Sequence, residues 1–244
     1  MYALWQKDDA EYTVFYEPNG GKPEGDNPVS VGAGEFHLLA GASKTGYDFA
    51  GWNTAAAGSG TWYDALRGIR ENLKLYAVFT PKTYVVRYEP DGGTYCEGVN
   101  PNYIVYGESV DLKPVTKSGC VFLGWFDRET GGEKIETIGA ENILRLTTLY
   151  ARFEKIVYKI TLRAGEGVFE ADGKTLREHT YALTFGEKLV LPSAVLAGYD
   201  FCGWQDESGR IVEKIDEFNI GNMTLTAKYR SASEVYRLIY ELDG

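Results

Sequence analysis

Gly46-Tyr47-Asp48-Phe49-Ala50-Gly51-Trp52 is the stretch that decides the fold, because it occurs three times in one chain. The later copies read Gly119-Cys120-Val121-Phe122-Leu123-Gly124-Trp125 and Gly198-Tyr199-Asp200-Phe201-Cys202-Gly203-Trp204. Three matches in one register indicate an internal repeat, which must be recognised before any fold is assigned. The chain is therefore predicted to contain several copies of one small module.

Two further motifs mark the ends of each copy. The closing motif, Leu-Tyr-Ala-Val-Phe in its first full form, starts at residues 75, 149 and 225. A version of it also starts at residue 1, so that the steps are 74, 74 and 76 residues. The opening motif, Tyr-Thr-Val-Phe-Tyr-Glu-Pro-Asn-Gly-Gly, occupies residues 12–21 and returns at 84–93, in divergent form at 158–163, and at 236–244.

These motifs predict the domain organisation. Three repeats occupy residues 12–80, 81–154 and 155–230, after the end of a preceding repeat with its linker at 1–11 and before the start of a following repeat at 231–244. Counting both partial copies, we expect a longer parent protein with at least five modules. The strand stubs at 1–5 and 236–240 have an apolar face, so at least one of them is expected to pair with a sheet edge.

Composition limits the classes of function. The formal net charge of −10 argues against nucleic acid and anionic membrane surfaces as partners, because both require clustered Lys and Arg. The sequence contains no run of about 18 apolar residues that would predict a membrane-spanning helix. Cys96, Cys120 and Cys202 fall at three different places in the repeat, so no disulfide is implied and each is expected to be a small buried hydrophobe.

Periodicity predicts a mainly β module of the α+β class. The alternation at residues 12–16 predicts a half-buried opening strand, which an Asn-Gly-Gly or Asp-Gly-Gly turn ends. Residues 103–112 and 181–191 have the signature of a hairpin with a Gly-Glu turn. Gly-Tyr-x-Phe-x-Gly-Trp is predicted to be a strand with Phe on one face and a core Trp on the other. A short helix is predicted at 65–72 and at 141–146.

Short linkers predict limited freedom between neighbouring modules. Residues 6–11, 80–83, 154–157 and 230–235 connect the copies, and each linker has four to six residues. Neighbours joined in this way are expected to form a semi-rigid rod, roughly 90 Å long for three modules in line.

The sequence has no convincing catalytic, metal or cofactor motif. Residues 41–45 lack the glycines that a phosphate-binding loop needs. His37 and His179 lie at non-equivalent positions of different modules, so neither a triad nor a two-His metal site is expected. Residues 170–173 lack the carboxylate spacing of a calcium loop. We therefore predict no enzyme, no cofactor and no metal.

Aromatic residues outside the repeated positions are the candidate ligand contacts. Polar segments that follow each repeated Trp vary between copies, and variable loops on a constant frame are where binding specificity usually lies. Trp62 and Tyr63 have no aromatic counterparts in the other copies. The candidate contacts are Trp62, Tyr63, Tyr95 and Phe126.

The three motifs together resemble the Listeria/Bacteroides repeat family, the B-repeat of internalin-type bacterial surface proteins. The third copy departs from the pattern, since Ala164-Gly165-Glu166-Gly167 replaces the Pro-Asn/Asp-Gly-Gly turn. The resemblance implies a small β-grasp-like module with a curved sheet and a short helix, on an exported, surface-attached bacterial protein. It implies an adhesion or spacer role without cofactor or catalytic residues.

Two functions remain open from the sequence. The first is a non-catalytic stalk that presents a recognition domain lying outside these residues, at the bacterial cell surface and anchored through other regions. The alternative is a direct adhesin that binds a host-surface protein or a glycan through variable loops or sheet edges. An enzyme hidden in one module is a third hypothesis, which the absence of a catalytic constellation opposes.

Overall fold

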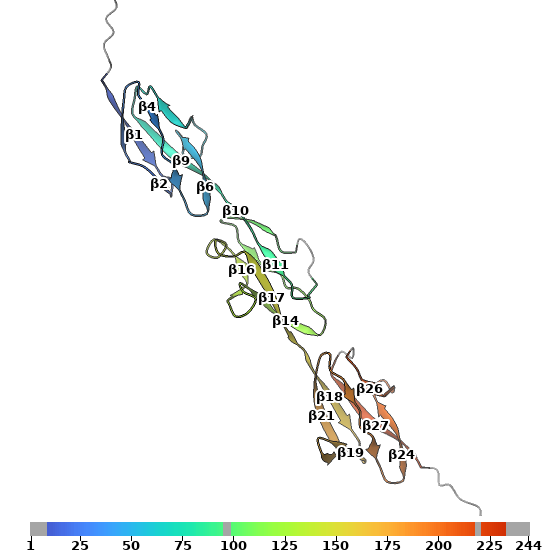
Figure 1. The fold of residues 1–244 in the computed structure, drawn as a ribbon. Coiled ribbons are helices and arrows are strands. Elements are labelled where there is room, and N and C mark those ends of the chain that lie inside the picture. The colour runs from blue at the N-terminus through green and yellow to red at the C-terminus, as the bar shows by residue number, and fades with distance from the viewer. Residues whose placement is uncertain (1–8, 95–98, 218–220, 233–244) are drawn as a thin grey trace, which may run out of the picture. The chain divides into compact units, whose positions relative to one another are not determined.

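The computed structural model describes residues 9–94, 99–217 and 221–232, and in these ranges every regular element is a β-strand (Figure 1). The mainly β prediction is confirmed, but the α+β class is wrong. Residues 65–72 contain β8 (Ala65–Arg67), which pairs with β4 (Phe36–Leu38). Residues 139–146 form successive turns, in which Ile143 N donates to Gly139 O at 2.9 Å. Such short segments make too few hydrogen bonds to offset the cost of helix nucleation.

The first repeat is built on a five-stranded mixed sheet. The opening strand pairs in parallel with the closing strand, and the other neighbours are antiparallel. The strand order is β3 (Val29–Gly32), β1 (Glu11–Glu17), β9 (Leu73–Pro81), β6 (Tyr47–Asn53) and β7 (Trp62–Tyr63). The three repeated motifs are therefore the three central strands.

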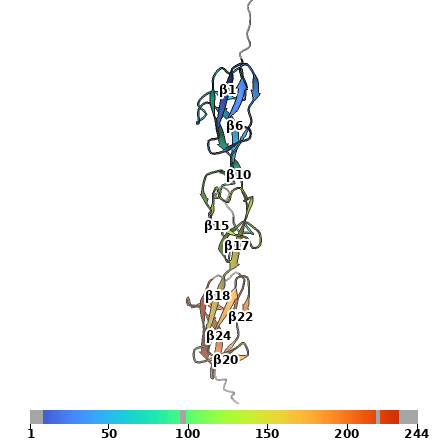
Figure 2. The same ribbon diagram turned by 90° about the vertical axis from the view of Figure 1, so that its left-hand side faces the viewer.

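The third repeat has the same order, and the second has a shorter version of it (Figures 1 and 2). The third sheet comprises β21 (Glu178–Thr184), β18 (Val157–Arg163), β27 (Met223–Ser231), β24 (Tyr199–Gln205) and β25 (Ile211–Val212). The second comprises β11 (Arg87–Glu89), β17 (Thr148–Lys155), β14 (Cys120–Phe126) and β15 (Lys134–Ile135), while β10 (Thr83–Val85) pairs with β12 (Tyr103–Val105).

Short strands form smaller sheets in each repeat. They are β2 (Lys22–Pro23) with β5 (Ala42–Ser43), β13 (Val110–Asp111) with β16 (Thr137–Ile138), β22 (Leu189–Val190) with β26 (Lys214–Ile215), and β19 (Val168–Ala171) with β20 (Lys174–Leu176) and β23 (Ala194–Val195).

The predicted opening strand and its turn are confirmed. In β1, Val14 and Tyr16 are buried, and Phe15 between them is exposed. Asn19 and Asp91 have φ of 51° and 47°, and each is followed by a glycine with positive φ. This left-handed pair is the conformation that Asn-Gly and Asp-Gly adopt readily in tight turns.

The predicted hairpin is wrong, because the two arms join different sheets. The Gly-Glu turn exists, with Glu108 N donating to Val105 O at 3.0 Å. However, β12 pairs with β10, whereas β13 pairs with β16. The third repeat does the same, since β21 pairs with β18 and β22 with β26. The turn is therefore a corner between two sheets; alternation alone cannot tell which partner an arm takes.

The predicted opposition of Phe and Trp in the motif strand is also wrong. The pairing of β6 with β9 shifts register between Phe49 and Gly51, and Gly51 has a φ of 137°. This β-bulge inserts one residue and reverses the alternation. Phe49 and Trp52 consequently lie on the same side, with ring centroids 5.4 Å apart. The second glycine of the motif is the residue that permits the bulge.

The repeated tryptophans are core residues, as predicted. Trp52, Trp125 and Trp204 are buried, and each indole N–H donates to a main-chain carbonyl twelve residues earlier, at 2.7, 2.8 and 2.7 Å. Each of these core positions therefore buries a large ring without leaving its polar atom unsatisfied.

The cysteines do not all lie where the sequence predicted. Cys202 is exposed and Cys120 is partly exposed, so the prediction of buried thiols is wrong for these two; the bulged strand points Cys202 outward, as it does Ala50. Cys96 and the stubs at 1–5 and 236–240 lie outside the described residues.

The chain divides into two compact units. One unit contains Met1–Asp91, Cys96–Pro114 and Gly124–Ala151, and the other Gly92–Tyr95, Val115–Leu123 and Arg152–Gly244. The linkers predicted at 80–83 and 154–157 are each reduced to one residue between strands. Only Lys82 separates β9 from β10, and only Ile156 separates β17 from β18.

Candidate functional site

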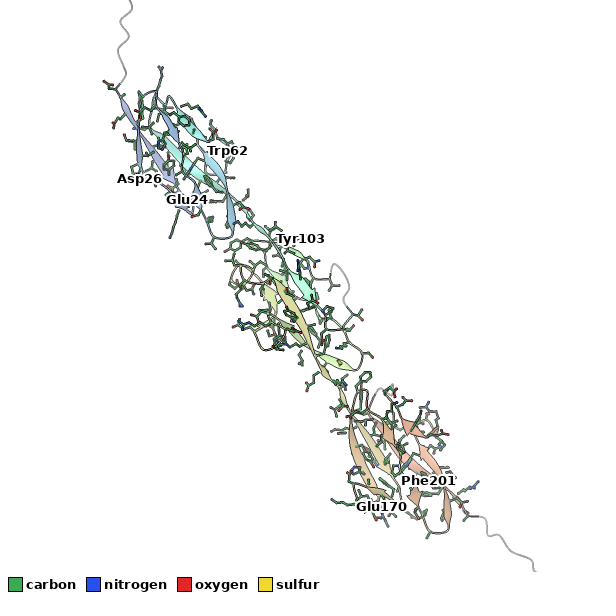
Figure 3. All side chains as sticks on the ribbon, in the orientation of Figure 1. Glu24, Asp26, Trp62, Tyr103, Glu170 and Phe201 are labelled. Atoms are coloured by element: carbon green, nitrogen blue, oxygen red, sulfur yellow. The ribbon has the colours of Figure 1, made fainter. Side chains whose placement is uncertain are left out.

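The best candidate contact surface surrounds Trp62 on the edge strand β7 (Figure 3). Its side chain is 50% exposed, which is unusual for a residue of this size. The ring lies over two glycines, since a Cβ atom on Gly51 or on Gly58 would stand 3.3 Å from it. A cavity of about 470 Å³ lies beside Trp62 and is lined by residues that include Gly41, Ala50 and Asp64. This is a shallow apolar platform with one carboxylate at its rim.

The other predicted contacts do not join Trp62 in one site. Tyr63 follows it on β7 but packs partly against the core of the first repeat, although it also lines the cavity. Phe126 lies in β14 of the second repeat, half-buried and paired with Lys134. Tyr95 lies outside the described residues. The structure therefore brings together Trp62 and Tyr63 but does not bring Phe126 to them.

The position of Trp62 has counterparts that the sequence comparison missed. Lys134 and Ile211 occupy the equivalent place, each covering the bulge glycine of its own repeat, Gly124 or Gly203. The shared feature is a side chain that covers the bulge glycine. Only in the first repeat is that covering side chain aromatic.

One polar side chain organises each variable loop. Asn53 Oδ1 accepts from Ala55 N and Gly60 N, both at 2.9 Å. In the second repeat Asp127 Oδ1 accepts from Glu133 N at 2.7 Å, and this hydrogen bond is the main reason why the pKa of Asp127 lies below its usual value. These hydrogen bonds connect the two ends of each loop.

Asp206 does the same in the third repeat, where its bonds to Ser208 and Arg210 lower the pKa of its carboxyl. These loop anchors were missed from the sequence. The available signal was an Asn directly after Trp52, and an Asp two residues after Trp125 and after Trp204.

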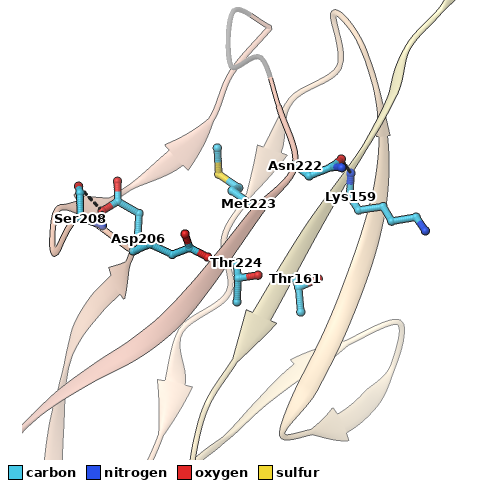
Figure 4. A pocket seen from close by; sticks show the side chains of 8 residues that line it. Lys159, Thr161, Asp206, Ser208, Asn222, Met223 and Thr224 are labelled. Carbon is cyan, nitrogen blue, oxygen red and sulfur yellow. Dashed lines mark hydrogen bonds between the residues drawn. The ribbon is translucent and has the colours of Figure 1, made fainter.

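A polar depression of about 510 Å³ lies beside Asp206 (Figure 4). Its lining includes Lys159, Thr161, Asn222 and Thr224. Asn222 Oδ1 accepts from Lys159 N at 2.8 Å, so that it serves the main chain. The depression is lined by hydroxyls and by the carboxylates of Asp206 and Glu207 but by no activated nucleophile. Asn72 makes the same hydrogen bond to Thr13 N in the first repeat. Asn222 and Asn72 therefore support the main chain of the opening strand in their repeats.

The segment that faintly resembles a phosphate loop lines a cavity of about 600 Å³ with Lys22, Lys44 and Lys82. Two of these ammonium groups already have partners. Lys82 lies 3.5 Å from Asp48, and Lys44 donates to Asn19 O at 3.4 Å while its Nζ stands 4.5 Å from the centre of the Tyr47 ring. Lys82 is therefore paired with a carboxylate, whereas the partners of Lys44 are uncharged.

Within the described ranges, no group of three His, Cys, Asp or Glu side chains could hold a metal ion. His37 lies on β4, whereas His179 on β21 is 3.2 Å from Asp172 and stacks edge-on against Tyr181. The same part of the chain has no helix long and apolar enough to cross a membrane.

Comparison with known proteins finds a family and several relatives. The model of the Listeria-Bacteroides repeat domain matches residues 12–78, 84–152 and 168–228. The chain is 30% identical to a "Putative Gly-rich membrane protein" of Evansella cellulosilytica, over 100% of this chain and 28% of the relative. It is 29% identical to a "Putative membrane protein" of the same organism, over 85% and 29%. It is 33% identical to Internalin H of Listeria monocytogenes, over 59% and 25%. The chain thus spans less than a third of the length of each relative.

Proposed function

Because this chain belongs to the Listeria-Bacteroides repeat domain family, we propose that it is a non-catalytic stalk of a bacterial cell-surface protein. The stalk would present a recognition domain that lies outside these residues, and other regions would anchor it to the cell wall or membrane. The relatives named as membrane proteins and as an internalin support an extracellular, cell-surface location.

The observation that carries the stalk proposal is the continuity of the main chain between copies. One residue separates a closing strand from the next opening strand, at Lys82 and at Ile156. So short a connection leaves few rotatable bonds, which favours a stiff spacer over a flexible string. The modules are proposed as three, with the boundaries given above, arranged as a rod.

We also propose that each module is β-grasp-like, without the helix. The support is the order of the first and third sheets, in which the opening and closing strands form a central parallel pair flanked by antiparallel neighbours. The small sheet of β4 and β8 occupies the part of the first repeat where the helix was expected.

Small-angle scattering of the full chain tests the stalk. A rod of roughly 90 Å has a radius of gyration of roughly 26 Å, whereas a compact globule of this length has about 18 Å. We expect the larger value, independent of protein concentration. The smaller value, or a broad distribution typical of a flexible chain, would remove the stalk proposal.

Trp62 favours a second candidate function, that of a direct adhesin. A half-exposed indole over glycines, beside an apolar cavity with Asp64 at its rim, has the features of a platform on which a sugar ring stacks. The host-side partner in this case is a glycan, or a protein that docks at the same edge of the first sheet.

Replacing Trp62 and Tyr63 with Ala tests that candidate on a glycan array and on host-cell surfaces. If the site binds a glycan, the double variant should lose at least about tenfold in apparent affinity, in line with one stacked ring and its desolvation. Ile211→Ala, at the equivalent position of the third repeat, is the matched control and should bind normally. Unchanged binding by the double variant would eliminate the platform.

A further inference from the structure

The first glycine of the repeated motif lies against an aromatic ring in two of the copies. Gly46 and Gly119 have φ of 81° and 67°. A Cβ atom built on Gly46 would overlap the ring of Tyr106, and one on Gly119 would overlap the ring of Phe185. Each ring belongs to the copy that follows its glycine, and each pair lies within one compact unit.

Hydrogen bonds through the single linker residue accompany both rings. Lys82 N donates to Gly46 O at 2.9 Å, and Tyr106 N donates to Lys82 O at 2.8 Å. At the next junction Ile156 N donates to Gly119 O at 2.9 Å. Phe185 N donates to Ile156 O, also at 2.9 Å. The linker peptide is therefore tied on one side to the preceding copy and on the other to the following copy.

The ring is carried by the corner between two sheets, and a carboxylate braces that corner. Glu108 Oε2 accepts from Val105 N at 3.3 Å, and Glu187 Oε2 accepts from Thr184 N at 2.8 Å. The residue between the ring and this Glu is a glycine with φ of 96° or 93°. This gives the unpredicted corner a purpose: it holds one aromatic side chain at the end of its module.

The corner of the first copy and the motif glycine of the third copy lack this ring contact among the described residues. Ala33 stands at the corner of the first copy, where its N donates to Ala10 O at 2.7 Å, so that copy has the hydrogen bond without a ring. Gly198 O accepts a hydrogen bond from Ala232 N at 3.0 Å. A Cβ atom on Gly198 would meet nothing among the described residues within 4 Å. Gly46 is buried, whereas Gly198 is exposed.

We propose that this glycine is a docking socket whose partner is the corner aromatic residue of the next copy. The socket admits a flat ring only because it has no side chain, and the shared linker peptide fixes the ring over it. Docking then couples neighbouring copies, so that loss of the ring in one copy weakens the copy before it. In repeat proteins such nearest-neighbour interfaces supply part of the stability of each unit.

Phe185→Ala in the full chain tests the coupling by hydrogen–deuterium exchange. Loss of one docked aromatic contact should speed exchange of the amides around residues 117–123 by about fivefold, although Phe185 belongs to the third copy. Tyr181→Ala is the control, because Tyr181 lies on β21, which leads directly to Phe185, but packs against the core of the third copy. It should speed exchange in the third copy only. Unchanged exchange at 117–123 in Phe185→Ala would overturn the proposal.

Glycine substitutions separate ring contact from backbone strain. Gly119→Ala and Gly198→Ala both place a Cβ on a residue with positive φ, but only the first meets a ring. Gly119→Ala should therefore lower the urea midpoint further than Gly198→Ala does. Adding Phe185→Ala to Gly119→Ala should remove most of that excess. Equal midpoints for the two single variants would contradict the socket, whatever the effect on the fold as a whole.

Discussion

Replacing Trp204 with Ala should lower the free energy of unfolding of the third repeat by about 3–5 kcal/mol. The side chain is 2% exposed, and its ring meets Phe169 and Phe201 edge-on at 5.2 and 5.6 Å. The substitution leaves a cavity and also orphans Pro192 O, which now accepts from the indole N–H at 2.7 Å. A domain of ordinary stability has only about 5–15 kcal/mol to lose, so this copy should be close to unfolding.

Hydrogen exchange resolved by copy measures this loss, because removing a fluorophore complicates fluorescence. Amides of β18, β24 and β27 should lose most of their protection, while β1, β6 and β9 keep theirs. Tyr199→Ala is the matched control: it lies on the same strand but is 49% exposed, and it should cost about 0.5 kcal/mol. If both variants lost the same protection, the indole would not be the centre of this core.

The sequence predicted the elements whose pattern is local. Alternation identified the opening strand, and Asn19 with its following glycines identified the turn, because both depend on residues that are neighbours in the chain. Burial of the three repeated tryptophans followed from their size. Repetition strengthened each of these inferences, since packing positions recur while loop positions change.

What the sequence could not predict depends on pairing between distant strands. The corner at Glu108 looks like a hairpin because each arm alternates, but the arms find partners in β10 and β16. The segment at 65–72 was predicted to hold a short helix, yet Ala65–Arg67 pairs with β4 as a strand. In both cases long-range pairing overrode a local preference.

The candidate site also has features that the sequence alone shows and features that depend on strand pairing. The unusual character of Trp62 was visible from the sequence, because no other copy has an aromatic residue there. That Tyr63 faces the core instead follows from its neighbour across the ladder, Trp52, and is visible only once the strands are paired. Lys134 and Ile211 could not be aligned with Trp62 by sequence, since the intervening loops differ in length.

Replacing Gly203 with Val should lower the free energy of unfolding of the third repeat by on the order of 3 kcal/mol. Gly203 has a φ of 122°, which side-chain-bearing residues rarely adopt, and a Cβ atom there would stand 2.8 Å from Ile211 Cγ2. The glycine permits the register shift that brings Phe201 to the same face as Trp204. Without the bulge, one of these two rings would turn toward solvent.

Cys202→Val is the control that isolates the backbone effect, because it adds the same side chain one position earlier. Cys202 is exposed, and valine suits a strand, so this variant should differ from the wild type by less than about 0.5 kcal/mol. Urea denaturation followed by circular dichroism compares the two variants directly. If Gly203→Val were as stable as Cys202→Val, the bulge would not need glycine, and the second Gly of the motif would require another explanation. A large loss in Gly203→Val alone would show that each copy keeps this glycine so that Phe and Trp can share one core.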